Sequence, residues 1–306
     1  MPGPRPRRTA LSLAALLAGA AAVIGGWTLA APSDARPPAA AASGAPQRAA
    51  AAAATPAVLP VTERLFAWTE VDYRSADAQR RYAIACMARQ GYRYAPAATP
   101  RPGTGADQRP EPFGRESATA PDAAAPPAEQ PPVPGSPETT KAYGRALFGD
   151  PADRVTAKGL RMSVSRPGHG CLAEAENTVL GDGRMRWLQV RILLFEGQEQ
   201  SRDDLEKDPA FQALNGRWRA CMEQAGFGGK SDPVRLLTAS ARTAQARATD
   251  PALAADLRCK GSTGYLATAY ARLSAAQQRW LDGHPDVARD WAALMSRQDA
   301  ATRPRP

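Results

Sequence analysis

The stretch "ACMEQAGFGG" at residues 220–229 repeats the frame of "ACMARQGYRY" at residues 85–94. Both stretches read Ala-Cys-Met-x-x-x-Gly-aromatic, and a chain with only four cysteines places two of them in these frames. Glycine suits the left-handed position just past a helix, and a Met with the following aromatic residue forms the hydrophobic pair of a Schellman ending. Each frame therefore predicts the end of a helix, with Gly91 and Gly226 as the C-capping glycines.

Helical patterns continue along the chain. Apolar residues recur at intervals of three and four in "AFQALNGRWRACMEQAG" (210–226), which places them on one helix face. Asp-Pro pairs at 208–209, 232–233 and 250–251 predict helix starts, because Asp is a good N-cap and Pro suits the first helical position. Further helices are expected at 172–180, 184–198 and 266–282, with a short terminal helix from Pro285. We expect an all-α, disulfide-fastened bundle of about five to seven helices, and the best strand-like segment is "GLRMSVSR" (159–166).

Two regions rich in Ala and Pro have little to bury. Residues 32–60 consist almost entirely of Ala, Pro and small polar residues, and they predict a disordered linker. Residues 97–137 contain one aromatic residue and one Val among frequent prolines, and they predict a disordered insert. The remainder is long enough for one helical domain over residues 61–298, followed by a disordered tail at 299–306.

The N-terminus has the features of an export signal. Arg5, Arg7 and Arg8 precede an uncharged stretch at residues 9–33, and cleavage after Ala30 or Ala35 would suit a signal peptidase. The apolar stretch is also long enough to span a bilayer, so residues 1–31 are either a signal peptide or an uncleaved N-terminal membrane anchor. In both cases the rest of the chain is expected outside the cytoplasm, either secreted or anchored at the outer face of the cytoplasmic membrane.

The four cysteines predict two disulfides, because their number is even and the expected compartment is oxidising. The preferred pairing is Cys86–Cys171 and Cys221–Cys259, in which each repeated frame closes onto the next cysteine downstream. The alternative joins the two frames, Cys86–Cys221, and leaves Cys171–Cys259. Redox-active or zinc-binding thiols are not favoured, since the chain has no Cys-x-x-Cys and its spacings fit no zinc pattern.

The net charge and the sequence motifs limit the classes of partner that the protein is expected to bind. The net charge is +9, but the basic residues are scattered and accompany no nucleic-acid-binding motif, so no nucleic-acid partner is expected. A mildly basic surface would favour an anionic wall polymer, and an envelope protein is the other expected partner. Contact with the membrane is expected only through the N-terminal segment, if that segment is uncleaved. The chain contains no phosphate loop, dinucleotide fingerprint or His-Glu-x-x-His motif, and no cofactor is expected.

Few side chains offer catalytic chemistry. His169 lies between two glycines in "PGHGC", which predicts a turn, and His284 precedes Pro285 at a predicted helix start. Two acidic groups would be able to supply the carboxylate pair of a glycosidase, although both lie in polar runs near helix ends. They are Asp203, Asp204 and Glu206 in one run and Glu174 and Glu176 in the other. Five tryptophans at helical spacing predict core packing: Trp68, Trp187, Trp218, Trp280 and Trp291. No catalytic residue and no metal ligand is assigned.

The order of the cysteine motifs resembles that of a group of functionally uncharacterised, secreted or cell-envelope proteins of streptomycete-type actinobacteria. The resemblance rests on four stretches, "CMARQGYRY", "HGCLAEAENTVLGD", "RWRACMEQAGF" and "ADLRCKGSTGYLATAYA", which together contain all four cysteines. It covers most of residues 62–96 and 167–282. The resemblance implies an exported helical protein with two disulfides, and it brings no assigned activity.

These features favour an exported, non-enzymatic protein of the cell envelope that acts as a binding or interaction module. One alternative is a cell-wall hydrolase that uses carboxylates or His169. A second is a membrane-anchored accessory subunit of an envelope transporter, which requires the N-terminal segment to remain as an anchor.

Overall fold

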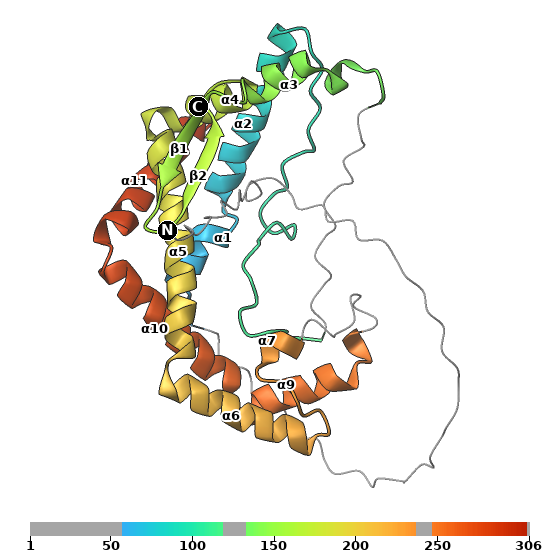
Figure 1. Cartoon of the computed structure of the whole chain (residues 1–306), viewed down its shortest axis with the longest axis vertical. Helices are drawn as coiled ribbons and strands as arrows, with labels where there is room; N and C mark the ends of the chain where they lie inside the picture. Colours follow the sequence, from blue (N-terminus) through green and yellow to red (C-terminus); the bar gives the residue numbers. More distant parts are fainter. Residues whose placement is uncertain (1–56, 119–132, 237–246, 305–306) are drawn as a thin grey trace, which may run out of the picture. The chain divides into compact units, whose positions relative to one another are not determined.

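The computed structural model describes residues 57–118, 133–236 and 247–304 (Figure 1). The predicted signal or anchor and nearly all of the predicted linker lie outside these residues. Within the described residues, no helix is both long enough and apolar enough to cross a membrane.

The described part of the chain is helical apart from one small hairpin, which confirms the all-α prediction. Seven of its helices have ten or more residues: α2 (Glu70–Arg89), α4 (Cys171–Leu180), α5 (Arg184–Glu206), α6 (Pro209–Gln224), α9 (Pro251–Thr263), α10 (Tyr265–Asp282) and α11 (Pro285–Thr302). Shorter helical segments are α1 (Pro60–Phe66), α3 (Lys141–Phe148) and α7 (Pro233–Leu236), with single 3-10 turns η1 (Pro137–Thr139) and η2 (Gly181–Gly183).

The two repeated frames end helices as predicted. Gly91 and Gly226 have positive φ angles, +79° and +83°. The Tyr92 N–H donates to the Met87 carbonyl at the end of α2, and the Phe227 N–H donates to the Met222 carbonyl at the end of α6. This bond from the residue after the glycine back to the methionine defines a Schellman ending.

Helix starts also follow the prediction. Asp208 accepts hydrogen bonds from two backbone N–H groups of the first turn of α6, and Asp250 does the same for α9. Asp232 accepts from the Arg235 N–H at the start of the short helix α7. α11 begins at Pro285 but has 18 residues, so the prediction of a short terminal helix is wrong.

Three apolar clusters hold the helices together. Helices α6, α9 and α10 share one cluster, in which Leu214 and Trp218 are completely buried. A second cluster joins α5 to α1, α10 and α11. The third joins α2, α3 and α4 around the first disulfide. Because α10 belongs to the first two clusters, it links the α6–α9 end of the fold to α5.

The disulfides are Cys86–Cys171 and Cys221–Cys259, the preferred pairing. The first fastens the end of α2 to the start of α4, and the second fastens the end of α6 to α9. No cysteine is left free. Two disulfides of this kind indicate an oxidising environment outside the cytoplasm.

The hairpin corrects the strand prediction. Strand β1 (Arg154–Lys158) pairs antiparallel with β2 (Ser163–Pro167), so only the second half of the expected strip at 159–166 is a strand. Its first half is the turn, which lies on the buried carboxylate of Glu196 in α5. That carboxylate accepts three backbone N–H bonds of 2.6–2.7 Å from Leu160, Arg161 and Met162.

Replacing Glu196 by alanine should lower the free energy of unfolding by about 2–3 kcal/mol, because three donors lose a charged acceptor in a partly buried place. Amide hydrogen exchange at residues 160–162 should accelerate. Glu206→Ala, on the exposed last turn of the same helix, is the matched control and should change neither quantity. Unchanged protection at 160–162 in Glu196→Ala would contradict the prediction.

Three predicted boundaries are wrong where a neighbouring element supplies packing. The insert was predicted to be disordered over 97–137; residues 119–132 lie outside the described residues, but in the described part Phe113 is 3% exposed and belongs to the α6–α9–α10 cluster. The linker was predicted to reach residue 60, but Leu59 is buried in the same cluster and α1 begins at Pro60. The tail was predicted to begin at 299, whereas α11 continues to Thr302 because Asp299 pairs with Arg74 of α2.

Candidate functional site

An open polar pocket lies beside the first disulfide. Its volume is about 490 Å³. The end of α2, the loop between β2 and α4, and the exposed face of α4 line it with Gln90, Gly168, His169, Gly170, Glu174, Asn177 and Thr178. The pocket therefore unites segments from both sides of the Cys86–Cys171 bond.

Close backbone packing shapes the loop that carries His169. A Cβ on Gly170 would stand 2.7 Å from the carbonyl carbon of Phe148, at the end of α3, and Gly170 has a φ of +97°. A Cβ on Gly168 would stand 2.7 Å from Asp153 Oδ1. A side chain at either position would push the loop away from its neighbours. Packing therefore requires glycine at 170, where the neighbours are backbone atoms, whereas at 168 the Asp153 side chain would have to move aside.

The imidazole of His169 lies at the pocket mouth. Its Nε2 is 3.1 Å from Asp153 Oδ2, and the side chain is 84% exposed. The backbone of Asp153 is fixed at the base of the hairpin, where its carbonyl accepts the Gly168 N–H at 2.9 Å. The carboxylate can orient the ring, but the ring remains open to solvent.

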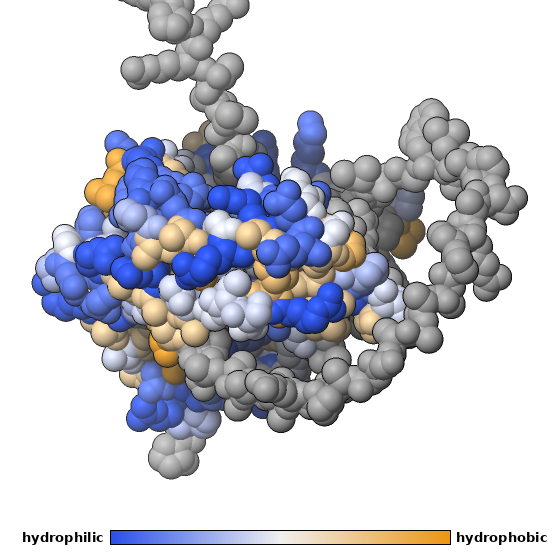
Figure 2. Space-filling model, turned by 90° about the horizontal axis from the view of Figure 1, so that it is seen from below, coloured by the Kyte–Doolittle hydropathy of each residue, from blue (hydrophilic) through white to orange (hydrophobic). Residues whose placement is uncertain are grey.

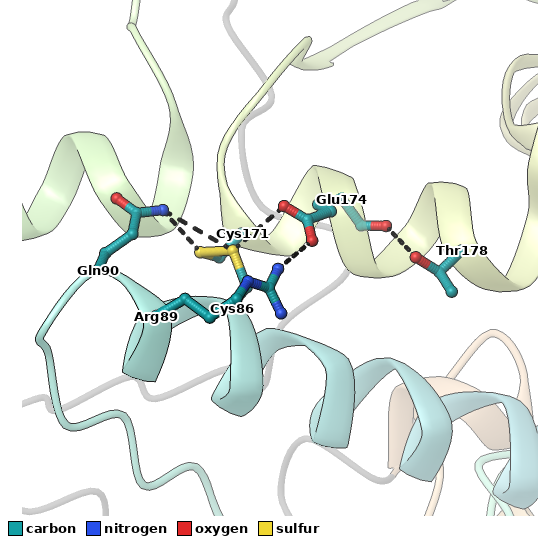
Figure 3. Close-up of a disulfide and its surroundings, with 6 residues drawn as sticks. All are labelled: Cys86, Arg89, Gln90, Cys171, Glu174 and Thr178. Atoms are coloured by element: carbon teal, nitrogen blue, oxygen red, sulfur yellow. Dashed lines mark hydrogen bonds and ion pairs between the residues drawn. A yellow bond between two sulfur atoms is a disulfide. The ribbon is translucent and has the colours of Figure 1, made fainter.

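The disulfide lies beside Gln90 and Glu174, two residues of the same site (Figure 3). The Gln90 amide nitrogen lies 3.2 Å from the sulfur of Cys171. Glu174 points toward Arg89 and pairs with it at 2.5 Å, so an ion pair crosses from α4 to α2. The carboxylate of Glu174 also lies 3.4 Å from the sulfur of Cys86. The exposed face of α4 thus carries an ion pair with α2 beside amide and hydroxyl groups.

The structure brings two of the sequence candidates together and separates the others. His169 and Glu174 line one pocket. Glu176 instead pairs with Arg166 and Arg184, at 2.5 and 2.8 Å, and braces α4 against β2 and the start of α5. The remaining candidates lie elsewhere: Asp203, Asp204 and Glu206 at the exposed end of α5, and His284 stacked on Trp280 at the start of α11.

The tryptophans are packing residues rather than a platform. Trp218 and Trp280 are buried, as predicted. Trp187 and Trp291 are half-buried and stack on each other with ring centroids 5.0 Å apart, between α5 and α11. Trp68 is half-buried, and its indole N–H donates to the Pro100 carbonyl at 2.9 Å. None of these rings is among the residues that line the pocket.

A buried ion pair in α9 was not predicted. The Lys260 Nζ is 2.7 Å from Asp256 Oδ2, both side chains are 1% exposed, and Asp256 Oδ1 accepts the Trp218 indole N–H at 2.9 Å. Burial raises the pKa of Asp256 and lowers the pKa of Lys260, while the ion pair opposes both shifts. An Asp and a Lys four residues apart on a helix are typical of a solvent-exposed pair. The sequence offers no signal that this pair is covered.

Outside the pocket, the described surface has few features that indicate a binding site. Figure 2, which views the molecule from below, shows mostly hydrophilic residues among its coloured atoms, interrupted by small apolar areas. Among the described residues, no group of three or more His, Cys, Asp and Glu side chains is arranged to hold a metal ion. Comparison of the chain with protein-family models, with curated proteins and with solved structures gave no match.

Proposed function

We propose that the protein is an exported, non-enzymatic module of the cell envelope that binds its partner through the pocket beside Cys86–Cys171. The observation that carries this proposal is the pocket itself, built from two segments that the disulfide joins. A covalent bond between its walls holds the lining groups in place before a ligand arrives, which lowers the ordering cost of binding.

The lining predicts the chemistry of the ligand. Amide, hydroxyl and imidazole groups line the pocket, and these groups both donate and accept hydrogen bonds. The carboxylate of Glu174 already pairs with Arg89, so it does not repel an anion strongly. Without Arg5, Arg7 and Arg8 of the predicted signal or anchor, 36 basic residues remain against 30 acidic ones, and this excess attracts acidic polymers over longer distances. The best fit is an anionic wall polymer whose units carry hydroxyl and amide groups, and an envelope protein is the other candidate partner.

The double substitution Asn177→Ala with Thr178→Ala should weaken binding to purified walls of the native host about tenfold or more, since it removes two exposed polar groups from one pocket wall. Co-sedimentation over a range of wall concentrations measures the effect. Gln212→Ala with Gln278→Ala changes two exposed polar residues of α6 and α10 and should bind as the wild type does. Equal binding by both double variants would reject the pocket as the wall-binding site.

The second candidate function, a wall hydrolase, is favoured by the presence of His169 and Glu174 in one pocket. The same experiment separates the two functions when the supernatant is analysed for soluble wall fragments. A hydrolase would release fragments, and Glu174→Gln would stop their release while the protein still sedimented with the wall. A binding module releases none, and the bound protein is recovered unchanged.

A further inference from the structure

Helix α3 presents a row of exposed side chains to solvent. Lys141, Arg145 and Phe148 follow one another at intervals of four and three residues, so they lie on one face of the helix, and all three are exposed. Tyr143 and Leu147 are buried instead and belong to the cluster around the first disulfide. We call Lys141, Arg145 and Phe148 the α3 stripe.

Phe148 differs from the other phenylalanines of the chain. All six lie in the described residues, and the other five belong to an apolar cluster or pack against one. Phe148 belongs to none of these clusters and is 54% exposed at the last turn of α3. One exposed apolar side chain is normal on a protein surface, so its neighbours decide whether it has a role.

The end of α3 lies against the loop of the polar pocket. A Cβ on Gly149, the residue after Phe148, would stand 2.3 Å from the His169 carbonyl oxygen. A Cβ on Gly170 would stand 2.7 Å from the Phe148 carbonyl carbon. Because His169 and Gly170 both line the pocket, the backbone of Phe148 adjoins the pocket wall. From there the stripe continues along α3 for about 10 Å, since a helix rises about 1.5 Å per residue.

The two cations of the stripe have no ionic partner in the part of the chain that the structure describes. Neither Lys141 nor Arg145 forms an ion pair there. Of the acids near them in the sequence, Glu138 hydrogen-bonds to Ser136, and Asp150 accepts a backbone N–H of the turn after α3 at 2.9 Å. Lysine and arginine bind phosphate and carboxylate groups, so the stripe suits acidic groups at two points one helical turn apart.

Both ends of α3 are fixed, which gives the stripe a defined position. At its start the Thr140 hydroxyl accepts the Tyr143 N–H at 3.1 Å, and at its end the Gly149 N–H donates to the Arg145 carbonyl at 2.8 Å. The Tyr143 ring also packs edge-on against Tyr92, with ring centroids 5.3 Å apart. A surface that is ordered before the ligand arrives lowers the cost of binding, as in the pocket.

We propose that the α3 stripe extends the polar pocket into one site for an anionic wall polysaccharide. A sugar ring packs on Phe148, and acidic groups of the same polymer pair with Lys141 and Arg145. Wall binding, as proposed above, is the premise, and the stripe adds the class of polymer. A sugar ring has apolar C–H faces and a polar rim, so it fits an aromatic face beside amide, hydroxyl and imidazole groups. An acidic polymer without such rings would use the two cations but gain nothing from Phe148.

Co-sedimentation of the full-length, oxidised protein with protease-treated walls of the native host tests the aromatic contact. Phe148→Ala should bind about tenfold more weakly than the wild type at low and at high salt, because the contact is apolar. Phe148→Tyr keeps the ring and should bind as the wild type does. Tyr82→Ala removes an exposed ring from α2 and is the matched control, which should not weaken binding.

The charged contacts are tested by Lys141→Gln with Arg145→Gln. This variant should bind about fivefold more weakly at low salt, and the difference should shrink in about 1 M salt, which screens exposed charges. Lys207→Gln with Arg217→Gln removes the same charge from exposed positions after α5 and on α6, and it should bind as the wild type does.

The stripe is rejected if Phe148→Ala binds as well as Tyr82→Ala, or if the two charge variants bind alike. Loss of wild-type binding after protease treatment of the walls would identify a protein as the occupant and would also overturn the proposal. The pocket variant Asn177→Ala with Thr178→Ala separates the stripe from the pocket. Weaker binding by that variant alone overturns the stripe and supports the pocket, and weaker binding by the stripe variants alone does the reverse. A wild type that does not sediment with walls overturns both.

Discussion

Replacing Cys86 and Cys171 together by alanine should lower the free energy of unfolding by about 4.5 kcal/mol, because the bond between them closes a loop with a sequence separation of 85. The corresponding change at Cys221 and Cys259 opens a shorter loop, with a separation of 38, and should cost about 4 kcal/mol. The cost arises mainly in the unfolded chain, which gains more freedom when the longer loop is opened. Urea denaturation of the oxidised wild type and the two double variants measures both values.

The affinity of the same variants for walls provides a second measurement. The first disulfide joins the two walls of the polar pocket, so the Cys86→Ala/Cys171→Ala variant should also lose affinity for walls under conditions in which it is folded. The Cys221→Ala/Cys259→Ala variant keeps both pocket walls joined and serves as the control. If the first variant is destabilised by less than about 2 kcal/mol, loop closure is not the main contribution of this bond.

The second large effect is expected at the buried ion pair. Lys260→Met should lower the free energy of unfolding by about 3–5 kcal/mol, because it leaves the carboxylate of Asp256 buried without its countercharge. The Arg115 carbonyl loses its donor as well, so residues 109–116 should be held less firmly. Urea denaturation at pH 7 measures the loss.

The pH dependence of Lys260→Met identifies the cause. Burial already raises the pKa of Asp256 above its ordinary value of 3.8, and without the ammonium nothing of equal strength opposes that rise. The folded state then holds a proton that the unfolded state has lost, so stability falls as pH rises from about 4 through the raised pKa. The variant should therefore recover stability relative to the wild type on acidification from pH 7 to pH 5.

The matched control neutralises both partners. Asp256→Asn with Lys260→Met keeps an acceptor for the Trp218 indole N–H but leaves no buried charge. Its stability should lie within about 2 kcal/mol of the wild type and should not improve on acidification. A double variant as unstable as Lys260→Met would show that packing around the lysine stem, and not the charge, is responsible.

The helix ends and helix starts were predictable because their signals are local. The Schellman endings at Gly91 and Gly226 depend on residues within one turn, and Asp208 and Asp250 cap the N–H groups of the residues directly after them. The preferred disulfide pairing was also correct: the cysteine of each repeated frame is bonded to the next cysteine along the chain.

The groups that were missed interact over long distances in the sequence. Glu196 is one acid in a helix, and nothing near it indicates that a hairpin turn 34–36 residues earlier donates to it. Phe113 is one aromatic residue among prolines, without a periodic pattern. The aromatic side chains that pack around it lie about 100 or more positions later in the sequence. Composition describes how much a segment can bury by itself. It does not show whether side chains distant in the sequence can bury one of its residues.

In the candidate site, too, the local features were predictable and the long-range contacts were not. The turn at His169 was predicted from its two glycines, and the helix that carries Glu174 was predicted from its pattern. The pocket itself was not predicted, because it also needs Gln90 of α2, which the Cys86–Cys171 bond fastens beside α4, and the packing of α3 against the loop.

The two disulfides also determine what a protease can do to this protein. They divide the chain into two covalent rings, residues 86–171 and 221–259, joined by residues 172–220. A single cut inside either ring leaves one molecule on a non-reducing gel, and only a cut between the rings separates its halves. That joining part consists largely of α4, α5 and α6, whose amides are hydrogen-bonded within helices and resist cleavage. A copy nicked inside either ring would therefore keep the pocket beside Cys86–Cys171 and the α6–α9–α10 cluster in one covalent particle.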